Sequence, residues 1–314
     1  MNLKDIILEK LQMNNFQAQI VSIIHIYNLK KEICKLYEQS LIYSRIYDIY
    51  LAEDHDFTLL DHFPEAKSLF IIAAPCHQTK IIFHYEDNEY TALLPSIIYK
   101  EEINRRKAER ILKEVLENNG FEVRDAALPE KLIAVHSGLG LYGQNNLCYV
   151  SGMGSFLSLA LFCSNFPSEN DSWYELESLK SCKNCRVCLE SCPTQAIDKE
   201  RFLLYAEKCL AFYNENSGIF PDWLDPYSHT CLIGCLECQL KCPHNKSQIS
   251  QFDDEVFFSQ EETNHLLGGT PFDKLPMLLS DKIKKYGLKK YYVSLSRNLM
   301  AIIKRYRLKE KKTR

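Results

Sequence analysis

Apolar and polar residues alternate along this 314-residue chain in patterns that predict both helices and strands. Between residues 101 and 118, apolar side chains recur at the spacing of a single helical face: Ala108, Ile111, Leu112, Val115 and Leu116. Asn119-Gly120 supplies a carboxyl-terminal stop, and the Arg and Glu residues of this helix are expected to face water. A second helix is predicted from Pro129 to Gly138, because proline is tolerated at the first helical position. Residues 1–60 are predicted to be mainly helical.

Short apolar runs predict a sheet. Residues 68–74 and 80–85 have the length and composition of buried strands. Residues 147–150 and 156–163 are expected to form a hairpin, with Gly152 and Gly154 in its turn. Strands mixed with helices in this way favour an α/β or α+β class.

Residues 138–143 have a G-x-G-x-x-G outline. A dinucleotide-binding fingerprint follows a strand and opens a helix, whereas this segment follows a predicted helix. We therefore favour a glycine loop that lets the backbone approach a large flat cofactor or a neighbouring element.

The composition, 46% hydrophobic and 25% charged, is ordinary for a globular enzyme. No uncharged apolar stretch approaches the roughly 20 residues of a membrane-spanning helix, so no membrane association is expected. The net charge of -3 hides an asymmetry, because residues 281–314 carry 13 Lys or Arg against Asp281 and Glu310.

This basic segment, with its interleaved tyrosines, is suited to a nucleic-acid backbone, because Lys and Arg supply most sequence-independent affinity for phosphates. Apolar residues also recur within it at helical spacing: Tyr292, Leu295, Leu299, Ile302, Ile303 and Tyr306. RNA contact and a plain surface helix therefore both remain open.

Two cysteine runs carry the strongest chemical signal. They are Cys182-x2-Cys185-x2-Cys188-x3-Cys192-Pro193 and Cys235-x2-Cys238-x3-Cys242-Pro243. The first has the bacterial ferredoxin spacing, in which three thiolates bind one [4Fe–4S] cube and the fourth binds the other cube. The second run is one cysteine short, and the pair predicts two [4Fe–4S] clusters.

Two cubes need eight thiolates, so one further ligand is required, and Cys209 and Cys231 are the candidates. We favour Cys209, which lies in a helix-like stretch after a predicted turn. The predicted ligands are then Cys182, Cys185, Cys188 and Cys242 for one cluster, and Cys192, Cys209, Cys235 and Cys238 for the other. Zinc and a disulfide framework are the alternatives, but structural zinc sites use paired spacings and close at four ligands.

The remaining cysteines lie in or beside apolar stretches and are predicted to be buried small hydrophobic residues: Cys34, Cys76, Cys148, Cys163 and Cys231. Many free thiols and an amino terminus with no secretory apolar region indicate a reducing compartment. A cytoplasmic protein is expected.

With these pieces placed, the chain resembles the epoxyqueuosine reductases, cobalamin-dependent iron–sulfur enzymes related to reductive dehalogenases. The most specific similarity is the order and spacing of CKNCRVCLESCPTQAI at 182–197, the lone Cys209, and GCLECQLKCPHNK at 234–246. The resemblance covers most of residues 60–300 and supports Cys209 over Cys231.

Shorter matches lie upstream, at Glu130-Lys131 and within residues 137–155. They resemble the family's cofactor domain, where cobalamin lies over one cluster. The resemblance implies these cofactor-binding residues: Gly138, Gly140, Tyr142, Gly143, Gly154 and Ser155. Cobalamin rests on the resemblance alone, because no Asp-x-His-x-x-Gly run supplies an axial histidine. Leu295-Ser296-Arg297-Asn298-Leu299 resembles the family's helical tail, which contributes to tRNA handling.

The chain also departs from the family pattern. The family has an acidic residue, proposed as proton donor, shortly before the Glu-Lys pair, and the match here is Asp125, one residue out of register. Tyr99-Lys100-Glu101 stands where an aromatic and histidine motif is expected. These departures are typical of a paralogue with another substrate, and Asp125 is the implied catalytic residue.

The resemblance implies a reductase that receives electrons from a low-potential donor such as a ferredoxin or flavodoxin. Two [4Fe–4S] clusters would relay them to a cobalamin that reduces the substrate, with tRNA as the substrate carrier. One alternative is a two-cluster electron-transfer or corrinoid-activating protein with no small-molecule or tRNA substrate of its own. Another is a nucleic-acid-binding protein whose clusters are structural or sense oxygen.

The predicted architecture is an α/β (α+β) cofactor domain with a central sheet flanked by helices, a ferredoxin-like double-cluster domain and a helical carboxyl-terminal segment packed back on the first domain. The predicted boundaries are 1–170, 171–250 and 251–314.

Overall fold

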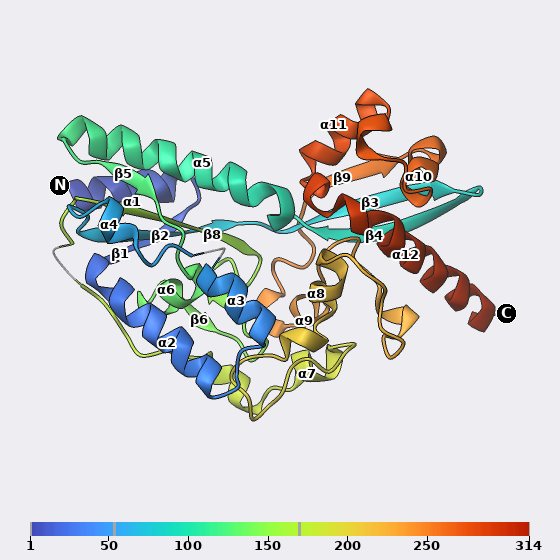
Figure 1. Cartoon of the computed structure of the whole chain (residues 1–314), viewed down its shortest axis with the longest axis horizontal. Coiled ribbons are helices and arrows are strands. Elements are labelled where there is room, and N and C mark those ends of the chain that lie inside the picture. Colours follow the sequence, from blue (N-terminus) through green and yellow to red (C-terminus); the bar gives the residue numbers. More distant parts are fainter. Residues whose placement is uncertain (1, 53–54, 169–170, 314) are drawn as a thin grey trace. The chain divides into compact units, whose positions relative to one another are not determined.

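The computed structural model describes residues 2–52, 55–168 and 171–313 (Figure 1). The chain divides into two compact units, and it passes between them more than once. The first unit comprises Met1–Pro75, Glu101–Arg186 and Ile197–Ala206, and the second comprises Cys76–Lys100, Val187–Ala196 and Glu207–Arg314. The contiguous division into 1–170, 171–250 and 251–314 stays a prediction.

The first unit is built on a four-stranded antiparallel sheet with strand order β1-β2-β8-β5. The strands are β1 (Gln17–Ser22), β2 (Ser68–Pro75), β8 (Leu157–Ser164) and β5 (Val123–Asp125). β2 confirms the buried strand predicted at 68–74. β1 lies in the stretch predicted to be mainly helical, so that prediction is wrong for these six residues, whose pairing with β2 fixes them as a strand.

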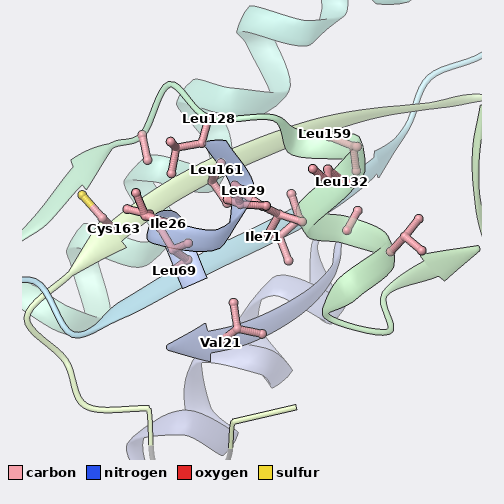
Figure 2. Packing of buried hydrophobic residues seen from close by; sticks show 14 of the residues in the cluster. Val21, Ile26, Leu29, Leu69, Ile71, Leu128, Leu132, Leu159, Leu161 and Cys163 are labelled. Carbon is pink, nitrogen blue, oxygen red and sulfur yellow. The ribbon is translucent and has the colours of Figure 1, made fainter. Parts of the chain in front are cut away.

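Alternation along β2 shows that both faces of this sheet are buried. Leu69, Ile71 and Ala73 belong to one hydrophobic core, and Phe70 and Ile72 belong to a second core on the opposite face. Figure 2 shows part of the first core. Because successive strand residues point to opposite faces, a strand buried on both sides has a continuous apolar sequence.

Helices cover each face of the sheet (Figure 1). α1 (Leu3–Met13) and α5 (Ile97–Leu116) supply buried residues to one core, and α2 (Ile26–Glu38) and α6 (Glu130–His136) supply them to the other. The helices predicted near 101–118 and after Pro129 are confirmed as α5 and α6. α3 (Ser44–Ala52) and α4 (Leu59–His62) complete the helices of this unit. A central sheet flanked by helices is the predicted fold class, and it is confirmed.

The predicted hairpin of residues 147–150 with 156–163 is wrong. β7 (Cys148–Val150) pairs with β6 (Gly140–Tyr142) in a separate two-stranded ribbon, whereas β8 pairs with β2 and β5. All eight residues of β8 are buried, so its backbone N–H and C=O groups need hydrogen-bond partners. Pairing with β2 on one edge and with β5 on the other supplies them. The turn at Gly152 and Gly154 instead carries the chain from the ribbon into that sheet.

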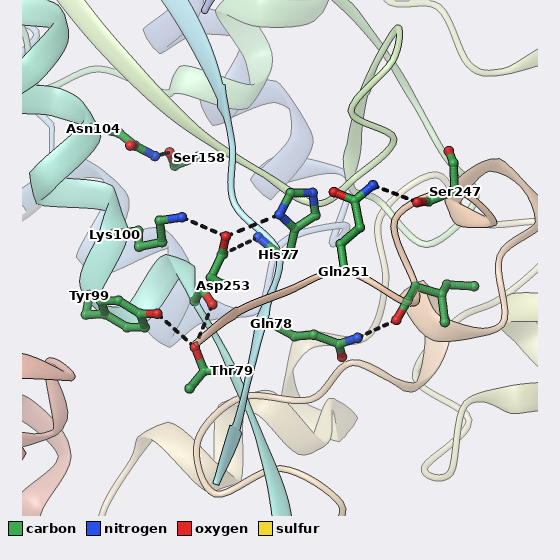
Figure 3. A network of polar contacts seen from close by, with 12 residues as sticks. His77, Gln78, Thr79, Tyr99, Lys100, Asn104, Ser158, Ser247, Gln251 and Asp253 are labelled. Atoms are coloured by element: carbon green, nitrogen blue, oxygen red, sulfur yellow. Dashed lines mark hydrogen bonds and ion pairs between the residues drawn. The ribbon is translucent and has the colours of Figure 1, made fainter. Parts of the chain in front are cut away.

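The second unit contains a three-stranded sheet of order β4-β3-β9. β3 (Gln78–Tyr85), the predicted strand at 80–85, is antiparallel to β4 (Asn88–Pro95) and parallel to β9 (Phe252–Phe258). At the start of β9, Asp253 accepts hydrogen bonds from the His77 backbone N–H (2.7 Å) and from Lys100 Nζ (2.7 Å) (Figure 3). Burial raises the pKa of Asp253, but these donors outweigh it and hold that pKa well below its usual range. The carboxylate thus joins the start of β3 to the start of β9.

Three helices pack on this sheet: α10 (Gln260–Leu267), α11 (Met277–Lys285) and α12 (Tyr292–Thr313). The predicted helical tail is confirmed as α12, and its buried apolar residues are Leu295, Leu299, Ile302 and Ile303. Lys304, Arg307 and Lys309 on the same helix are exposed, and Arg307 pairs with Glu86. Arg314, the last residue of the predicted basic segment, lies outside the described residues.

Short helices dominate the cysteine-rich part of the chain: α7 (Val187–Ser191), α8 (Leu210–Glu215) and α9 (Glu237–Leu240). The 3₁₀ turns are η1 (Ile23–His25), η2 (Glu117–Asn119), η3 (Lys180–Asn184), η4 (Ala206–Lys208), η5 (Pro226–Ser228), η6 (Pro243–Asn245), η7 (Phe272–Lys274) and η8 (Leu288–Tyr291). Within the described residues, no helix has the length and hydrophobicity needed to span a bilayer.

Candidate functional site

A cavity of about 540 Å³ opens in the first unit, beside the end of β5 and the start of α6. Most of its wall is apolar, and the aliphatic and aromatic residues that line it include Ile33, Leu36, Leu41, Ile42, Leu128, Leu132, Phe202 and Leu203. Ligand sites typically have such apolar walls with a few convergent polar groups. The polar groups in this cavity come mainly from α5, β5 and α6.

Arg105 lies at the centre of the polar wall. It donates a hydrogen bond from Nη1 to Asp125 Oδ1 (2.6 Å) and another from Nη2 to Glu130 Oε1 (2.5 Å). The Arg105 side chain is only 20% exposed, so the expectation that the Arg residues of this helix face water is wrong at this position. One guanidinium is therefore shared by two carboxyl groups at the wall of the cavity.

The two carboxylates differ in burial. The Asp125 side chain is 54% exposed and the Glu130 side chain is 22% exposed. Burial raises the pKa of Glu130 to about 7, against the opposing charge of Arg105 and with the support of nearby Glu101. A carboxyl group with such a pKa exchanges its proton near neutral pH.

The structure brings only some of the predicted site residues to this cavity. Asp125 and Tyr142 line it, as do Glu130 and Lys131. Within the described part of the chain, the other predicted cofactor-binding residues are not part of its lining: Gly138, Gly140, Gly143, Gly154 and Ser155. Their assignment to a cofactor stays a prediction.

Two of these glycines have a local packing reason. A Cβ on Gly140 would lie 2.6 Å from Cys148 Sγ and 2.9 Å from the Tyr149 carbonyl oxygen. A Cβ on Gly143 would lie 2.4 Å from the Tyr149 ring. The glycines allow β6 and β7 to approach closely, which fits the predicted approach of the backbone to a neighbouring element.

Sequence reasoning missed Arg105 and the cavity segments at 41–43 and 202–206. Arg105 follows Glu101 by one helical turn, so both lie on the side of α5 from which they line the cavity. This spacing of four residues could have indicated from the sequence that Glu101 and Arg105 share one face of the helix. The segments at 41–43 and 202–206 carry no motif, because they contribute mainly apolar wall.

Thiol groups of the second unit gather around the predicted second cluster. Burial raises the pKa of Cys209, and the nearby Cys192 thiol raises it further. Burial also raises the pKa of Cys235, with added contributions from Cys231, Cys238 and Cys209. The predicted ligands Cys192, Cys209, Cys235 and Cys238 therefore lie near one another, and Cys231 lies near them as well. A [4Fe–4S] cube requires such a group of thiols, and the choice of Cys209 over Cys231 stays a prediction.

Polar contacts from α12 hold the backbone around this neighbourhood. Asn298 is buried and donates from Nδ2 to the carbonyl oxygens of Asn214 (2.8 Å) and Leu232 (2.8 Å). Asn214 in turn donates to the carbonyl oxygen of Gly234 (2.9 Å), which precedes Cys235 and has a φ of +70°. The Arg297-Asn298 segment that resembles the family's tail thus supports the cluster loop.

Cysteines of the predicted first cluster lie in both units. Cys188 in α7 and Cys242, which precedes η6, are buried, and α7 packs on α9 in the second unit. Cys182 in η3 and Cys185 lie in the first unit, where the Cys185 N–H donates to the Cys182 carbonyl oxygen (3.1 Å). This ligand set stays a prediction.

No group of three or more His, Cys, Asp or Glu residues in the described ranges converges as a single metal ion would require. The ligands of a cube bind separate corners, so they need not converge on one point. Among the other cysteines, the prediction of burial is confirmed for Cys76, Cys148, Cys163 and Cys231, whereas Cys34 is half-buried and accepts a hydrogen bond from the Tyr47 hydroxyl (3.4 Å).

A known family model supports the prediction of two [4Fe–4S] clusters. Residues 181–245 match a family model described as a 4Fe-4S double cluster binding domain. This range contains all eight predicted cluster ligands.

Curated relatives are epoxyqueuosine reductases. The chain is 30% identical over 142 residues to the enzyme of Lactococcus garvieae, covering 45% of this chain and 39% of the relative. It is 32% identical over 144 residues to the Escherichia coli enzyme, covering 46% of this chain and 36% of the relative. The matches thus span about two fifths of the length of these relatives.

Solved structures of epoxyqueuosine reductases have a similar fold. The structure from Streptococcus thermophilus gives a TM-score of 0.66 at 20% identity, over 96% of this chain and 81% of that one. A crystal structure of an epoxyqueuosine reductase with an epoxyqueuosine-modified tRNA-Tyr stem loop gives a TM-score of 0.69 at 18% identity, over 97% and 81% of the two chains. At these identities the likeness establishes the fold.

Proposed function

We propose that this member of an epoxyqueuosine reductase-like family is an iron–sulfur reductase that relays electrons through two [4Fe–4S] clusters to a substrate bound in the cavity of the first unit. The observation that carries the proposal is the gathering of Cys192, Cys209, Cys235 and Cys238 within a segment that matches a double-cluster model. The first cluster would use Cys182, Cys185, Cys188 and Cys242.

The relatives suggest the substrate. They reduce epoxyqueuosine, and one was crystallised with a modified tRNA stem loop. We propose an epoxyqueuosine-type base on tRNA as the substrate and a ferredoxin or flavodoxin as the electron donor. The exposed basic side chains of α12 would contact the RNA backbone. A tRNA substrate would make the cytoplasm the place of action.

The resemblance also implies a cobalamin, and two features of the cavity lining fit a corrinoid. Its apolar walls suit the hydrophobic edge of a corrin ring, and the buried Nδ2 of Asn146, which makes no hydrogen bond to the described residues, could donate to a peripheral amide. Tyr142 lines the same wall. When bound, a corrinoid would supply the metal-centred redox chemistry that side chains lack.

The chain's own groups would bind and protonate the substrate. The apolar wall excludes water, and Arg105 fixes two carboxylates at the polar side. Reductive loss of an oxygen requires protons as well as electrons. Asp125, the more exposed of the two carboxyl groups bonded to Arg105, is the proton donor that the resemblance implies.

The test is turnover of a tRNA stem loop carrying epoxyqueuosine. Purified protein is reduced anaerobically with cobalamin present, and loss of one oxygen from the modified nucleoside is followed by mass spectrometry. We expect conversion by the wild type and none by Cys209→Ser, which should lose the second cluster. Unchanged substrate with fully loaded wild type would contradict the proposal.

The second candidate is a two-cluster electron carrier without its own substrate. The register shift at Asp125 and the unusual Tyr99-Lys100-Glu101 segment favour it. An electron carrier of this kind would reduce an external acceptor rapidly and leave the stem loop unchanged under the same conditions.

A further inference from the structure

The arginine-linked carboxylates of the cavity are not equivalent. Glu130 is the first residue of α6, and its side chain is mostly buried, whereas Asp125 ends β5 and more than half of its side chain is exposed. Both accept a hydrogen bond from the same guanidinium. A proton held by Glu130 would therefore be inside the cavity, and Asp125 would lie toward solvent.

Seven other charged or titratable residues line the cavity together with Glu130. They are Tyr43, His55, Glu101, Arg105, Asp125, Lys131 and Tyr142. Glu101 and Asp125 raise the pKa of Glu130, whereas Arg105 lowers it, and burial is the largest influence. Because Arg105 is shared with Asp125, it cannot offset the burial of Glu130 fully.

We propose that Glu130 is the group that protonates the leaving oxygen of the substrate, and that Asp125 returns protons to it from solvent. The inference rests on the proposed function. Opening an epoxide to an alkene breaks two C–O bonds, forms one C=C bond and consumes two electrons and two protons, with the oxygen leaving as water. The clusters carry the electrons from the external donor, Glu130 gives the first proton, solvent supplies the second proton, and Asp125 passes a proton from solvent back to Glu130.

This assignment differs from the one that sequence resemblance implies. Asp125 alone would place the acid at the solvent side, where water competes for the proton. Glu130 combines access to the cavity with a pKa of about 7, and a proton donor works best when its pKa is close to the working pH.

The experiment compares Glu130→Gln, Glu130→Asp and Asp125→Asn with the wild type, all with matched iron content. Turnover of the epoxyqueuosine stem loop is measured from pH 5.5 to 8.5, a range of about three units centred near the expected pKa. A second readout is the infrared C=O band of protonated carboxyl groups across the same pH range, which does not depend on activity.

We expect wild-type turnover to fall as the pH rises through about 7. Glu130→Gln should lower kcat by about 10²–10⁴-fold, and Glu130→Asp should restore part of it. Asp125→Asn should move the falling limb to lower pH, because it removes a negative charge and leaves Arg105 to Glu130 alone. Burial also raises the pKa of Glu215 to about 7, so Glu215 contributes to the carboxyl band of every variant. The part of the band that titrates in the wild type and is absent from Glu130→Gln should be that of Glu130.

Two results would overturn the assignment: a Glu130→Gln variant with at least half of wild-type turnover, or a wild-type carboxyl band identical to that of Glu130→Gln. Abolished turnover in Asp125→Asn with full turnover in Glu130→Gln would give the role to Asp125. A wild type that never converts the stem loop refutes the proposed function instead, and the infrared titration then still tests whether Glu130 holds the proton.

Discussion

Gly140→Ala should destabilise the first unit even when no cofactor is present. The new Cβ would meet Cys148 Sγ at 2.6 Å, the Tyr149 carbonyl oxygen at 2.9 Å and Val150 Cγ2 at 3.2 Å. Backbone cannot move aside as a flexible side chain does, so the β6–β7 ribbon must separate. Overpacking of this kind costs about 1–3 kcal/mol. For a domain of 150–250 residues, that corresponds to a fall in Tm of roughly 2–12 °C.

The assay is thermal unfolding followed by circular dichroism under anaerobic conditions, with and without added cobalamin. Cys148→Ala removes the closest clashing atom, so the Gly140→Ala/Cys148→Ala double variant should lose less stability than the sum of the single variants. A wild-type Tm for Gly140→Ala would refute the packing argument. If that variant kept its Tm but failed to bind cobalamin, the glycine would serve the cofactor rather than the ribbon.

Four further predictions test other parts of the structure. Cys209→Ser should reduce bound iron from about eight to about four per chain, whereas Cys231→Ser should leave it unchanged, as measured by iron analysis. Asn298→Ala should lower the stability of the second unit by about 1–3 kcal/mol per carbonyl left unpaired, because two buried acceptors lose their donor, and a change in Tm below 1 °C would contradict this. Burial and nearby Arg297 and Arg305 lower the pKa of His229 to about 4, so the folded state is fully stable with respect to this group above pH 6.5 and loses stability as the pH falls toward 4. His229→Phe should therefore flatten the pH dependence of Tm between pH 6.5 and 4. An unaltered pH profile of Tm would exclude this contribution of His229. Leu161→Ala, in the buried strand β8, should cost about 2–5 kcal/mol, and a loss under 1 kcal/mol in denaturant unfolding would show that the core there is not close-packed.

The elements that could be predicted from sequence are those whose burial is set locally. β2 is a nearly continuous apolar run, β3 has the apolar centre Ile81-Ile82-Phe83, and α5 has one apolar face, so each of these elements could be predicted from its own residues. β4 was missed because its first half, with Asn88, Glu89 and Thr91, is mostly polar and leaves only a short apolar run. The pairing of β7 with β6 was missed for a different reason, since pairing partners depend on the whole sheet and not on the turn that joins two strands.

The candidate site divides in the same way. The cysteine runs could be predicted, because cluster ligands are recognised by residue type and spacing. Arg105 and the apolar cavity wall could not, because each residue there is ordinary in its own segment and becomes significant only where helices and strands bring the segments together. The role of Asn298 was hidden for the same reason: an amide in a helix gives no sign of the two distant carbonyls that it will meet.

The central claim is that this chain carries two [4Fe–4S] clusters in the service of a reductase. The most direct measurement is anaerobic purification after iron and cobalamin supplementation, with iron, sulfide and cobalt quantified on the same sample. We expect about eight irons and eight sulfides per chain, with about one cobalt. About four irons or fewer, or zinc in place of iron, would contradict the two clusters, and eight irons without cobalt would contradict the corrinoid and favour the two-cluster electron carrier.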